Sequence, residues 1–399
     1  MSGFLEGLRV LDLTNVLAGP FCCHQLAHLG AEVIKVEVPG SGDLARQLGA
    51  DAELNAKRMG VSFLAQNPGK RSITLNLKHA AGREAFLKLV ATAEVVVENF
   101  RAGVMERLGV GFEVLKQARP GLVYCAISGF GQDGPARDLP AYDQIIQGLS
   151  GVMSITGEAE TAPYRVGYPV ADTIGGLTAA FAIAGALARR DRSKAAFIDV
   201  AMLEATLATM GWVVSNYLIA GREPAPLGNE NFTASPSGTF RTGEGLLNIA
   251  ANKQEQFEAV CRVLGRPELA GDPRFAERQG RLDHRAALKA ELEAALATKS
   301  AAAWEQELNA AGVPAGRVLT VPEALAHPQV RDRGMIGTFE QVPGVGRDIR
   351  VLRTGFKVDG AAPRVEAPPP ELGQDTEALL EELGYSRDDI ARLARERAI

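Results

Sequence analysis

Residues 8–14, LRVLDLT, open the pattern that decides the fold of this 399-residue chain. Three more apolar runs rich in β-branched residues follow, with helical stretches between them. These runs are AEVIKVEV at 31–38, AEVVVENF at 93–100 and GLVYCAIS at 121–128. Alternation of such runs with helices is typical of a parallel sheet covered by helices, so the sequence predicts an α/β fold.

Two helices can be predicted in more detail. The first has Pro20 in its opening turn and ends at Gly30, the usual Pro-start and Gly-end asymmetry. The second begins at Asp172 and has apolar residues along one face with Ala and Gly elsewhere, so we expect it to be buried on nearly all sides. Residues 173–188 carry no charge but fall short of the roughly 20 residues that span a bilayer, so no membrane partner is predicted.

The chain is expected to divide into more than one domain, because its length exceeds that of an ordinary single core. We assign residues 1–200 to a large domain, 201–238 to a linker, 239–315 to a small domain and 316–399 to a C-terminal part. The linker contains the Pro- and Gly-rich stretch GREPAPLGNENFTASPSG, which breaks all periodicity. In the C-terminal part, Ser386 and Asp389 have the spacing of a helix capping box.

Composition excludes several classes of protein. A net charge of -5 and the lack of Lys and Arg blocks argue against a nucleic-acid binder. Four cysteines, of which Cys22 and Cys23 are adjacent, form neither a disulfide framework nor a zinc motif, and they indicate a reducing compartment. The N-terminus lacks the basic and apolar regions of a secretory signal, so we expect a cytoplasmic protein.

Two motifs resemble cofactor or metal sites, but their sequence context does not support either interpretation. Residues 129–134, GFGQDG, match the GxGxxG pattern of nicotinamide- and flavin-binding proteins, but Pro135 and Pro140 interrupt the helix that should follow. His24 and His28 have the i, i+4 spacing of a metal pair, but no third ligand accompanies them. We therefore predict no metal and no permanently bound cofactor, and we interpret 129–134 as a glycine-rich turn near another ligand.

Asp172 is the main candidate for catalysis. At the start of a helix an aspartate often caps the backbone N–H groups, which stabilises the helix by about 1 kcal/mol. The same position can place a reactive carboxylate near the positive end of the helix, with Gly175 and Gly176 allowing a substrate to approach. The local sequence leaves both roles open.

A wider pattern favours the catalytic role, because ten segments in order resemble the class III coenzyme A transferase family, which includes formyl-CoA and carnitine CoA-transferases. The family is related to α-methylacyl-CoA racemases. The segments are LRVLDLTNVLAGP at 8–20, GAEVIKVEVPGSGDLAR at 30–46, NPGKRSITLNLK at 67–78, VENFRAGVMERLG at 97–109, ISGFGQDGP at 127–135, AYDQIIQGLSG at 141–151, ADTIGG at 171–176, DPRF at 272–275, AGVPAGRV at 311–318 and HPQVRDRGM at 327–335.

The resemblance implies a Rossmann-like large domain built from both ends of the chain, a smaller α+β domain and an interlocked homodimer. It implies that Asp172 is the nucleophile, acylated as an anhydride and then as a CoA thioester. For this reaction we expect backbone donors near Gly175 and Gly176 to face the oxyanion. Coenzyme A thioester would be a substrate, not a bound cofactor. The implied contacts to it are Val16, Ala18, Arg46, Leu75, Lys78, Asn99, Phe100, Arg107 and Tyr142.

Departures from the family pattern narrow the expected reaction. Leu17 replaces a glutamine of some formyl-CoA transferases, and residues 228–238, the expected flap, keep only Gly228 and Gly238 of a glycine-rich loop. Both argue against formyl or oxalyl transfer. Tyr142 stands where the racemases have an acid–base histidine, and a phenol that ordinarily titrates near pH 10 is unsuited to that task.

We therefore expect transfer of CoA from succinyl-CoA to a C4–C5 dicarboxylate such as itaconate, mesaconate or citramalate. An acyl-CoA racemase and a non-catalytic CoA-binding protein are the alternatives. Exchange of CoA between two acids, exchange of the α-proton with solvent, or neither reaction would distinguish the three.

Overall fold

The computed structural model describes residues 3–363 and 365–399, which form two compact units. Of the described residues, the large unit contains 3–152, 165–222, 328–363 and 365–399, and the small unit contains 153–164 and 223–327. The range expected as a linker, 201–238, contains two helices and part of a strand, and the change of unit falls after residue 222. The small unit also includes residues 153–164, which no composition change marks in the sequence.

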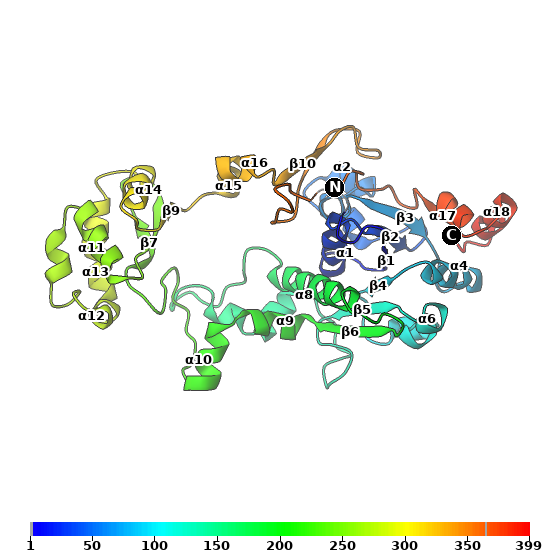
Figure 1. The fold of residues 1–399 in the computed structure, drawn as a ribbon, viewed down its shortest axis with the longest axis horizontal. Coiled ribbons are helices and arrows are strands. Elements are labelled where there is room, and N and C mark those ends of the chain that lie inside the picture. Colours follow the sequence, from blue (N-terminus) through cyan, green and yellow to red (C-terminus); the bar gives the residue numbers. More distant parts are fainter. Residues whose placement is uncertain (1–2, 364) are drawn as a thin grey trace. The chain divides into compact units, whose positions relative to one another are not determined.

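The large unit is built on a six-stranded sheet in which every neighbouring pair is parallel (Figure 1). The order β3-β2-β1-β4-β5-β6 reverses direction between β1 and β4, as in dinucleotide-binding folds. The predicted parallel α/β fold is confirmed. The strands are β1 (Arg9–Asp12), β2 (Glu32–Glu37), β3 (Lys70–Thr74), β4 (Val95–Glu98), β5 (Val123–Ser128) and β6 (Ala196–Ala201).

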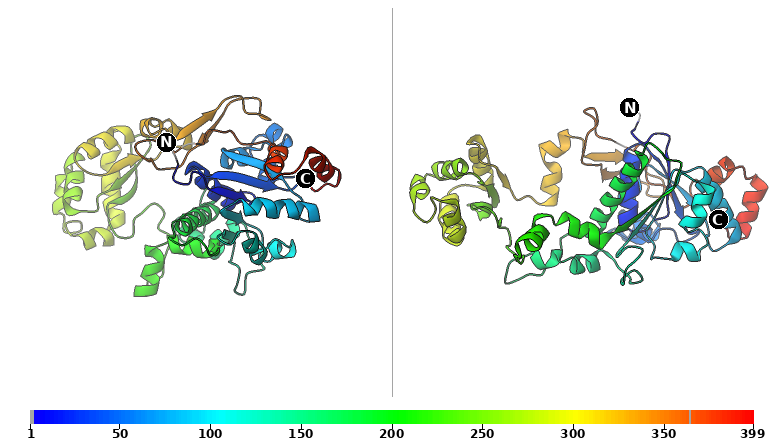
Figure 2. Two further views of the ribbon diagram at one scale, coloured as in Figure 1. Left: turned by 45° about the vertical axis from the view of Figure 1, so that its right-hand side comes forward. Right: turned by 60° about the horizontal axis from the view of Figure 1, so that its bottom comes forward.

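Helices cover both faces of this sheet, and each face has its own apolar core (Figure 2). One core packs α4, α6, α17 and α18 against the sheet, so the end of the chain belongs to the large unit. The other packs α1 and α8. These helices are α1 (Ala18–His28), α4 (Ala80–Ala91), α6 (Phe112–Ala118), α8 (Val170–Leu187), α17 (Thr376–Glu382) and α18 (Arg387–Arg395).

The helix predicted from Pro20 to Gly30 is α1. Gly30 follows its C-terminal end and has a φ of 97°, a backbone conformation that favours glycine. The capping box of Ser386 and Asp389 is also present at the start of α18. Short elements complete the large unit. They are η1 (Leu44–Gln47), α2 (Ala52–Ala56), α3 (Val61–Gln66), α5 (Val104–Arg107), α7 (Asp143–Leu149), α9 (Met202–Thr209), α10 (Trp212–Ala220), α16 (Pro328–Asp332) and the antiparallel pair β10 (Ile336–Phe339) and β11 (Ile349–Leu352).

Helix α8 corrects two expectations. It begins at Val170, two residues before Asp172, and it is not buried on nearly all sides: Phe181 is 81% exposed and Leu177 49%. The side that packs against α1 is the one with small residues, because only these allow two helix backbones to approach closely. Within residues 3–363 and 365–399, α8 alone has the length and apolar composition of a membrane-crossing helix, although it also carries Asp172.

The small unit packs helices against an antiparallel sheet of order β7-β8-β9, an α+β arrangement as expected. Its core is formed mainly by leucines and aromatic residues of these elements. The elements are β7 (Ser237–Arg241), β8 (Leu246–Ala250), α11 (Gln254–Val263), η3 (Pro267–Gly271), α12 (Arg278–Asp283), α13 (Arg285–Leu296), α14 (Ala301–Ala310), β9 (Ala315–Arg317) and α15 (Val321–Ala326), while η2 (Val152–Ile155) begins in the large unit's range and continues into the small unit's.

Candidate active site

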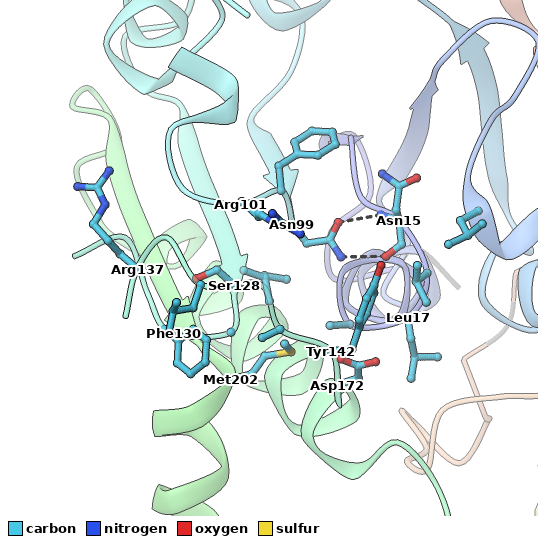
Figure 3. Close-up of a pocket in the computed structure, with 18 residues that line it drawn as sticks. Asn15, Leu17, Asn99, Arg101, Ser128, Phe130, Arg137, Tyr142, Asp172 and Met202 are labelled. Carbon is cyan, nitrogen blue, oxygen red and sulfur yellow. Dashed lines mark hydrogen bonds between the residues drawn. The ribbon is translucent and has the colours of Figure 1, made fainter. Parts of the chain in front are cut away.

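A pocket of about 330 Å³ lies in the large unit at the carboxyl ends of β1, β4 and β5, where the strand order reverses (Figure 3). Parallel sheets bind ligands at this position because the loops on either side diverge there. Asn15 and Asn99 follow β1 and β4 and join the two loops: Asn15 N–H donates to Asn99 Oδ1 at 2.8 Å, and Asn99 Nδ2 donates to Asn15 O at 2.8 Å. These two hydrogen bonds hold the loops after β1 and β4 together where they line the pocket.

Val16 lines this pocket in a conformation that valine rarely adopts, with a φ of 68°. A β-branched residue at positive φ needs strong support from its surroundings. Asp43 provides it, because its Oδ1 accepts the Val16 N–H at 2.9 Å while its Oδ2 lies 2.9 Å from Lys35 Nζ. The strained peptide turns the chain into the first turn of α1, where Ala18 also lines the pocket.

Asp172 projects into the same pocket from the first turn of α8, near Tyr142 and Leu17 (Figure 3). It does not cap this helix. Asp143 does so from α7: its Oδ1 accepts the N–H of Ala171 at 2.8 Å and that of Asp172 at 3.3 Å. Because another carboxylate occupies these donors, the side chain of Asp172 is left for the pocket, and the structural role considered for it belongs to Asp143.

The electrostatic surroundings of Asp172 oppose its ionisation. Burial, and then the negative charge of Asp143, raise the pKa of Asp172 to about 7. Within the described residues no Lys, Arg or His forms an ion pair with Asp172. A carboxylate with a raised pKa is a stronger base and a better nucleophile than an exposed one, provided that the pH is high enough to ionise it.

Gly175 and Gly176 have a different role from the predicted one. They lie inside α8, where backbone N–H groups donate to carbonyls four residues earlier, so they are poor candidates for oxyanion donors. Their function is close packing: a Cβ on Gly176 would lie 2.4 Å from the carbonyl oxygen of Ala18, and one on Gly175 would lie 2.8 Å from Met202 Cγ. The missing side chains bring Asp172 beside the start of α1.

The start of α1 is a better source of oxyanion donors. No side chain caps this helix, and its N-cap residue Leu17 and first residue Ala18 both line the pocket with Asp172. Uncapped N–H groups at a helix start can hold negative charge.

A second cavity, of about 710 Å³, adjoins the pocket, and the two share Asn15 and Phe100 as lining residues. Leu75 and Lys78, which follow β3, line this second cavity and not the pocket with Asp172. The pocket itself is lined by six of the predicted residues, namely Val16, Ala18, Asn99, Phe100, Tyr142 and Asp172. The site residues predicted from sequence therefore fall largely into two connected hollows.

Two arginines predicted to contact phosphates, Arg46 and Arg107, line neither cavity. Arg46 is fully buried, and its guanidinium donates to both carboxylate oxygens of Glu37, at 2.7 and 2.8 Å, and stacks on Phe63. It is a structural cation that cannot reach a ligand, which corrects the prediction. Arg107 is exposed at the end of α5, the helix whose Val104 also lines the second cavity, but Arg107 itself lines neither hollow.

Several lining residues were not predicted from sequence. Asn15 is one that the strand pattern could have revealed, because it follows β1 as Asn99 follows β4. Arg101 and Arg137 bring positive charge to the pocket from loops with no distinctive spacing. Asp143 had no local signal, because its contact with the start of α8 joins residues far apart in the chain.

The two cofactor motifs have other roles. Residues 129–134 form a loop after β5, and no helix begins before Asp143, so the dinucleotide interpretation is not supported, although Gly129 and Phe130 do line the pocket. His24 and His28 are buried with their Nε2 atoms 3.1 Å apart, and burial lowers the pKa of both. In the described part of the chain no group of three or more metal-ligating side chains occurs.

Comparison with known proteins identifies the family. Residues 5–376 match the model of CoA-transferase family III. The chain belongs to this family. The transferase is 43% identical, over 84% of its length and 85% of the relative's, to an acetyl-CoA:oxalate CoA-transferase of Acetobacter aceti. It is 38% identical to a succinate–glutarate CoA-transferase of Agrobacterium fabrum over 95% of each chain.

Other relatives of the transferase are named as succinyl-CoA transferases for D-citramalate and mesaconate. Among solved structures, a CAIB/BAIF family protein from Brucella suis matches with a TM-score of 0.84 and 37% identity, over 96% of this chain and all of the other. The family assignment and the CoA-transferase class predicted from the sequence are confirmed.

The expected flap of the transferase, residues 228–238, lies in the small unit. It is held there by Glu230, whose Oε1 accepts from Lys289 Nζ at 2.6 Å, and by the Asn231 N–H, which donates to the Ser237 carbonyl at 2.9 Å. Gly228 adopts a φ of 57° in this segment. A flap function for it stays a prediction.

Proposed function

We propose that this enzyme transfers CoA from succinyl-CoA to a C4–C5 dicarboxylate through covalent intermediates on Asp172. The observation that carries the proposal is the position of Asp172: an unpaired carboxylate with a raised pKa lines the pocket where the strand order reverses. Relatives named for glutarate, mesaconate, citramalate and oxalate support a dicarboxylate acceptor.

The first half of the reaction moves CoA onto the enzyme. The ionised Asp172 carboxylate attacks the thioester carbonyl of succinyl-CoA, and the CoA thiolate leaves to give a mixed anhydride. The thiolate then attacks the aspartyl carbonyl, which releases succinate and leaves a CoA thioester on Asp172. Activation is conserved at each step, so no ATP is required.

The second half repeats these steps with the acceptor. Its carboxylate attacks the aspartyl thioester and expels CoA thiolate, which then attacks the acceptor's acyl carbon and frees Asp172. The start of α1, next to Asp172, is the site we assign to the developing oxyanions. The anhydrides must be kept from water, because hydrolysis would lose the activation.

The two adjoining cavities, which share Asn15 and Phe100, support an assignment of the parts of an acyl-CoA. The thioester would lie beside Asp172, and the nucleotide would lie in the second cavity, which is mainly apolar and includes Lys78. Phe100 borders both hollows and would contact the ligand where it passes from one to the other. Apolar walls with few placed charges are typical of such sites.

Racemisation is the second candidate, and the pocket disfavours it. A racemase needs an acid and a base on opposite sides of the α-carbon. Tyr142 and Asp172 are the only pair of titratable acids that line the pocket within the described residues, and Tyr142 is 67% exposed at its rim. A phenol ordinarily remains protonated near neutral pH and makes a poor base there.

The decisive experiment incubates the protein with succinyl-CoA and a panel of acids that contains itaconate, mesaconate, citramalate, glutarate and oxalate. Mass spectrometry then follows new acyl-CoAs and a CoA adduct on the peptide with Asp172. We expect exchange with at least one C4–C5 acid and a fall of at least about a thousandfold in Asp172→Asn. The exposed Asp133→Asn should behave as wild type; normal exchange in Asp172→Asn would disprove the mechanism.

We also propose a cytoplasmic homodimer. All four cysteines are free and buried, as suits a reducing compartment. Apolar side chains stand exposed on α8 and α10, among them Phe181 at 81% and Ile219 at 86%, and monomers rarely leave such surfaces uncovered. Light scattering should give the mass of a dimer for the wild-type protein, and Ile219→Asp should weaken it; a monomeric wild type would refute the proposal.

A further inference from the structure

Two residues that follow α18, Arg397 and Ile399, form part of the wall of the second cavity, together with Asn76 and Lys78. They lie far along the sequence from the strands whose ends shape the rest of the cavity. Their position raises the question of what they contribute to a ligand.

Hydrogen bonds from two sides hold this segment in position. After α18, Arg397 takes a left-handed φ of 58°, and the Ala398 N–H donates to the Leu393 carbonyl at 2.9 Å to close the helix. Asn76 binds the tail from the other side: its N–H donates to the Ala398 carbonyl at 2.8 Å and its Nδ2 to the Arg397 carbonyl at 3.2 Å. Ala398 is fully buried. The tail is therefore a built wall of the cavity.

The charges around the cavity favour an anionic ligand with an apolar part. Among the lining residues only Glu37, Lys78 and Arg397 have charged side chains, and Glu37 is neutralised by Arg46 at 2.7 Å. Lys78 and Arg397 are exposed, and in residues 3–363 and 365–399 neither forms an ion pair. Both cations are therefore available to a ligand phosphate.

We propose that Arg397 binds a phosphate group of the CoA nucleotide, so that the segment after α18 forms part of the acyl-CoA site. This inference rests on the proposed function, because it takes the second cavity as the nucleotide site. Guanidinium groups suit phosphates because their N–H groups can donate two parallel hydrogen bonds. Arg397 is thus a binding residue for the donor that lies far from the chemistry at Asp172.

The test compares Arg397→Gln with Arg395→Gln, a matched control: Arg395 is also exposed at the end of α18 but lines no part of the cavity. Calorimetry measures the Kd of free CoA, and kinetics measure KM and kcat with succinyl-CoA. We expect Arg397→Gln to raise both Kd and the KM for succinyl-CoA about tenfold, with kcat and the KM of the acceptor unchanged. Arg397→Lys should restore part of the affinity.

A parallel series with 3′-dephospho-CoA identifies the phosphate. If Arg397 pairs with the 3′-phosphate, the variant and wild type should bind dephospho-CoA alike; if it pairs with the diphosphate, the tenfold difference should persist. Equal Kd values for CoA in Arg397→Gln and Arg395→Gln would overturn the inference. CoA binding without transfer would refute only the proposed function, whereas a wild-type protein that does not bind CoA would refute both.

Discussion

Two carboxylates of the large unit, the buried Asp12 and the half-buried Asp172, have opposite electrostatic surroundings. Asp12, at the end of β1, is fully buried between two lysines: Lys70 Nζ donates to its Oδ2 at 2.8 Å, and Lys35 Nζ lies 3.8 Å from its Oδ1. Asp172 lies beside another carboxylate, Asp143, and has no cation partner within the described residues. We refer to them as the paired and the unpaired carboxylate.

The difference is visible in their acidities. Burial alone would raise the pKa of Asp12, but Lys35 and Lys70 outweigh it and lower that pKa to about 2. At Asp172 burial acts unopposed and Asp143 adds to it, so the pKa rises to about 7. The paired carboxylate stays ionised and stabilises the folded state. The unpaired one is more basic and so suited to reaction, but its ionised form lowers the stability of the folded state.

The largest expected effect comes from breaking the paired region. Lys70→Met should lower the free energy of unfolding by about 3 kcal/mol, because Asp12 would stay buried with only the more distant Lys35. Urea denaturation measures the loss. Lys57→Met is the control, since its ion pair with Glu53 is exposed and should contribute less than about 0.5 kcal/mol. Equal losses in the two variants would contradict this view of Asp12.

Removing the charge of the unpaired carboxylate, Asp172, should increase the stability of the folded protein. Asp172→Asn should raise the free energy of unfolding by about 2 kcal/mol at pH 8, because the folded state then no longer holds a carboxylate whose pKa is raised from 3.8 to about 7. The folded protein binds the extra proton below pH 7, so this gain should shrink as the pH falls and vanish below about pH 4.

Thermal or urea unfolding at several pH values would check the prediction, with Asp12→Asn as its counterpart. At pH 8 that variant should be less stable than wild type, because the buried Lys70 loses its carboxylate partner, whereas Lys35 keeps Asp43. A loss of stability in both variants would mean that Asp172 is a structural residue like Asp12.

The smallest expected effect measures how much the charge of Asp143 contributes to the raised pKa of Asp172. Asp143→Asn keeps a carbonyl oxygen for the N–H groups of Ala171 and Asp172 but removes the negative charge. The pKa of Asp172 should then fall, and since only the ionised form attacks, the rise of kcat/KM with pH should move down by about one pH unit. An unchanged profile would show that burial alone sets the acidity of Asp172; Asp133→Asn serves as the exposed control.

The fold was predictable where the pattern is local. Strands buried on both faces appear as continuous apolar runs, and the helix from Pro20 to Gly30 has signals at both ends, so the α/β class and α1 follow from sequence. The extent of burial of α8 did not follow. Its composition is apolar all round, and nothing local indicates which side packs against α1 and which, with Phe181, stays exposed.

The site was predictable in part for the same reason. Family resemblance assigned Asp172, Asn99 and Phe100, but it also included Arg46, which proved to be a buried partner of Glu37. The sequence does not show whether a given arginine binds a ligand phosphate or a carboxylate of the protein itself. Only the packing around it decides which anion is near.

Sequence by itself determined the α/β class, the family and the residue expected to react, because these depend on residue type and spacing along the chain. Tertiary structure decided what surrounds each charge: two lysines around Asp12, Asp143 beside Asp172, and Arg397 at the wall of the second cavity. Electrostatic energy depends on distance and burial in space, and the order of residues along the chain does not specify either.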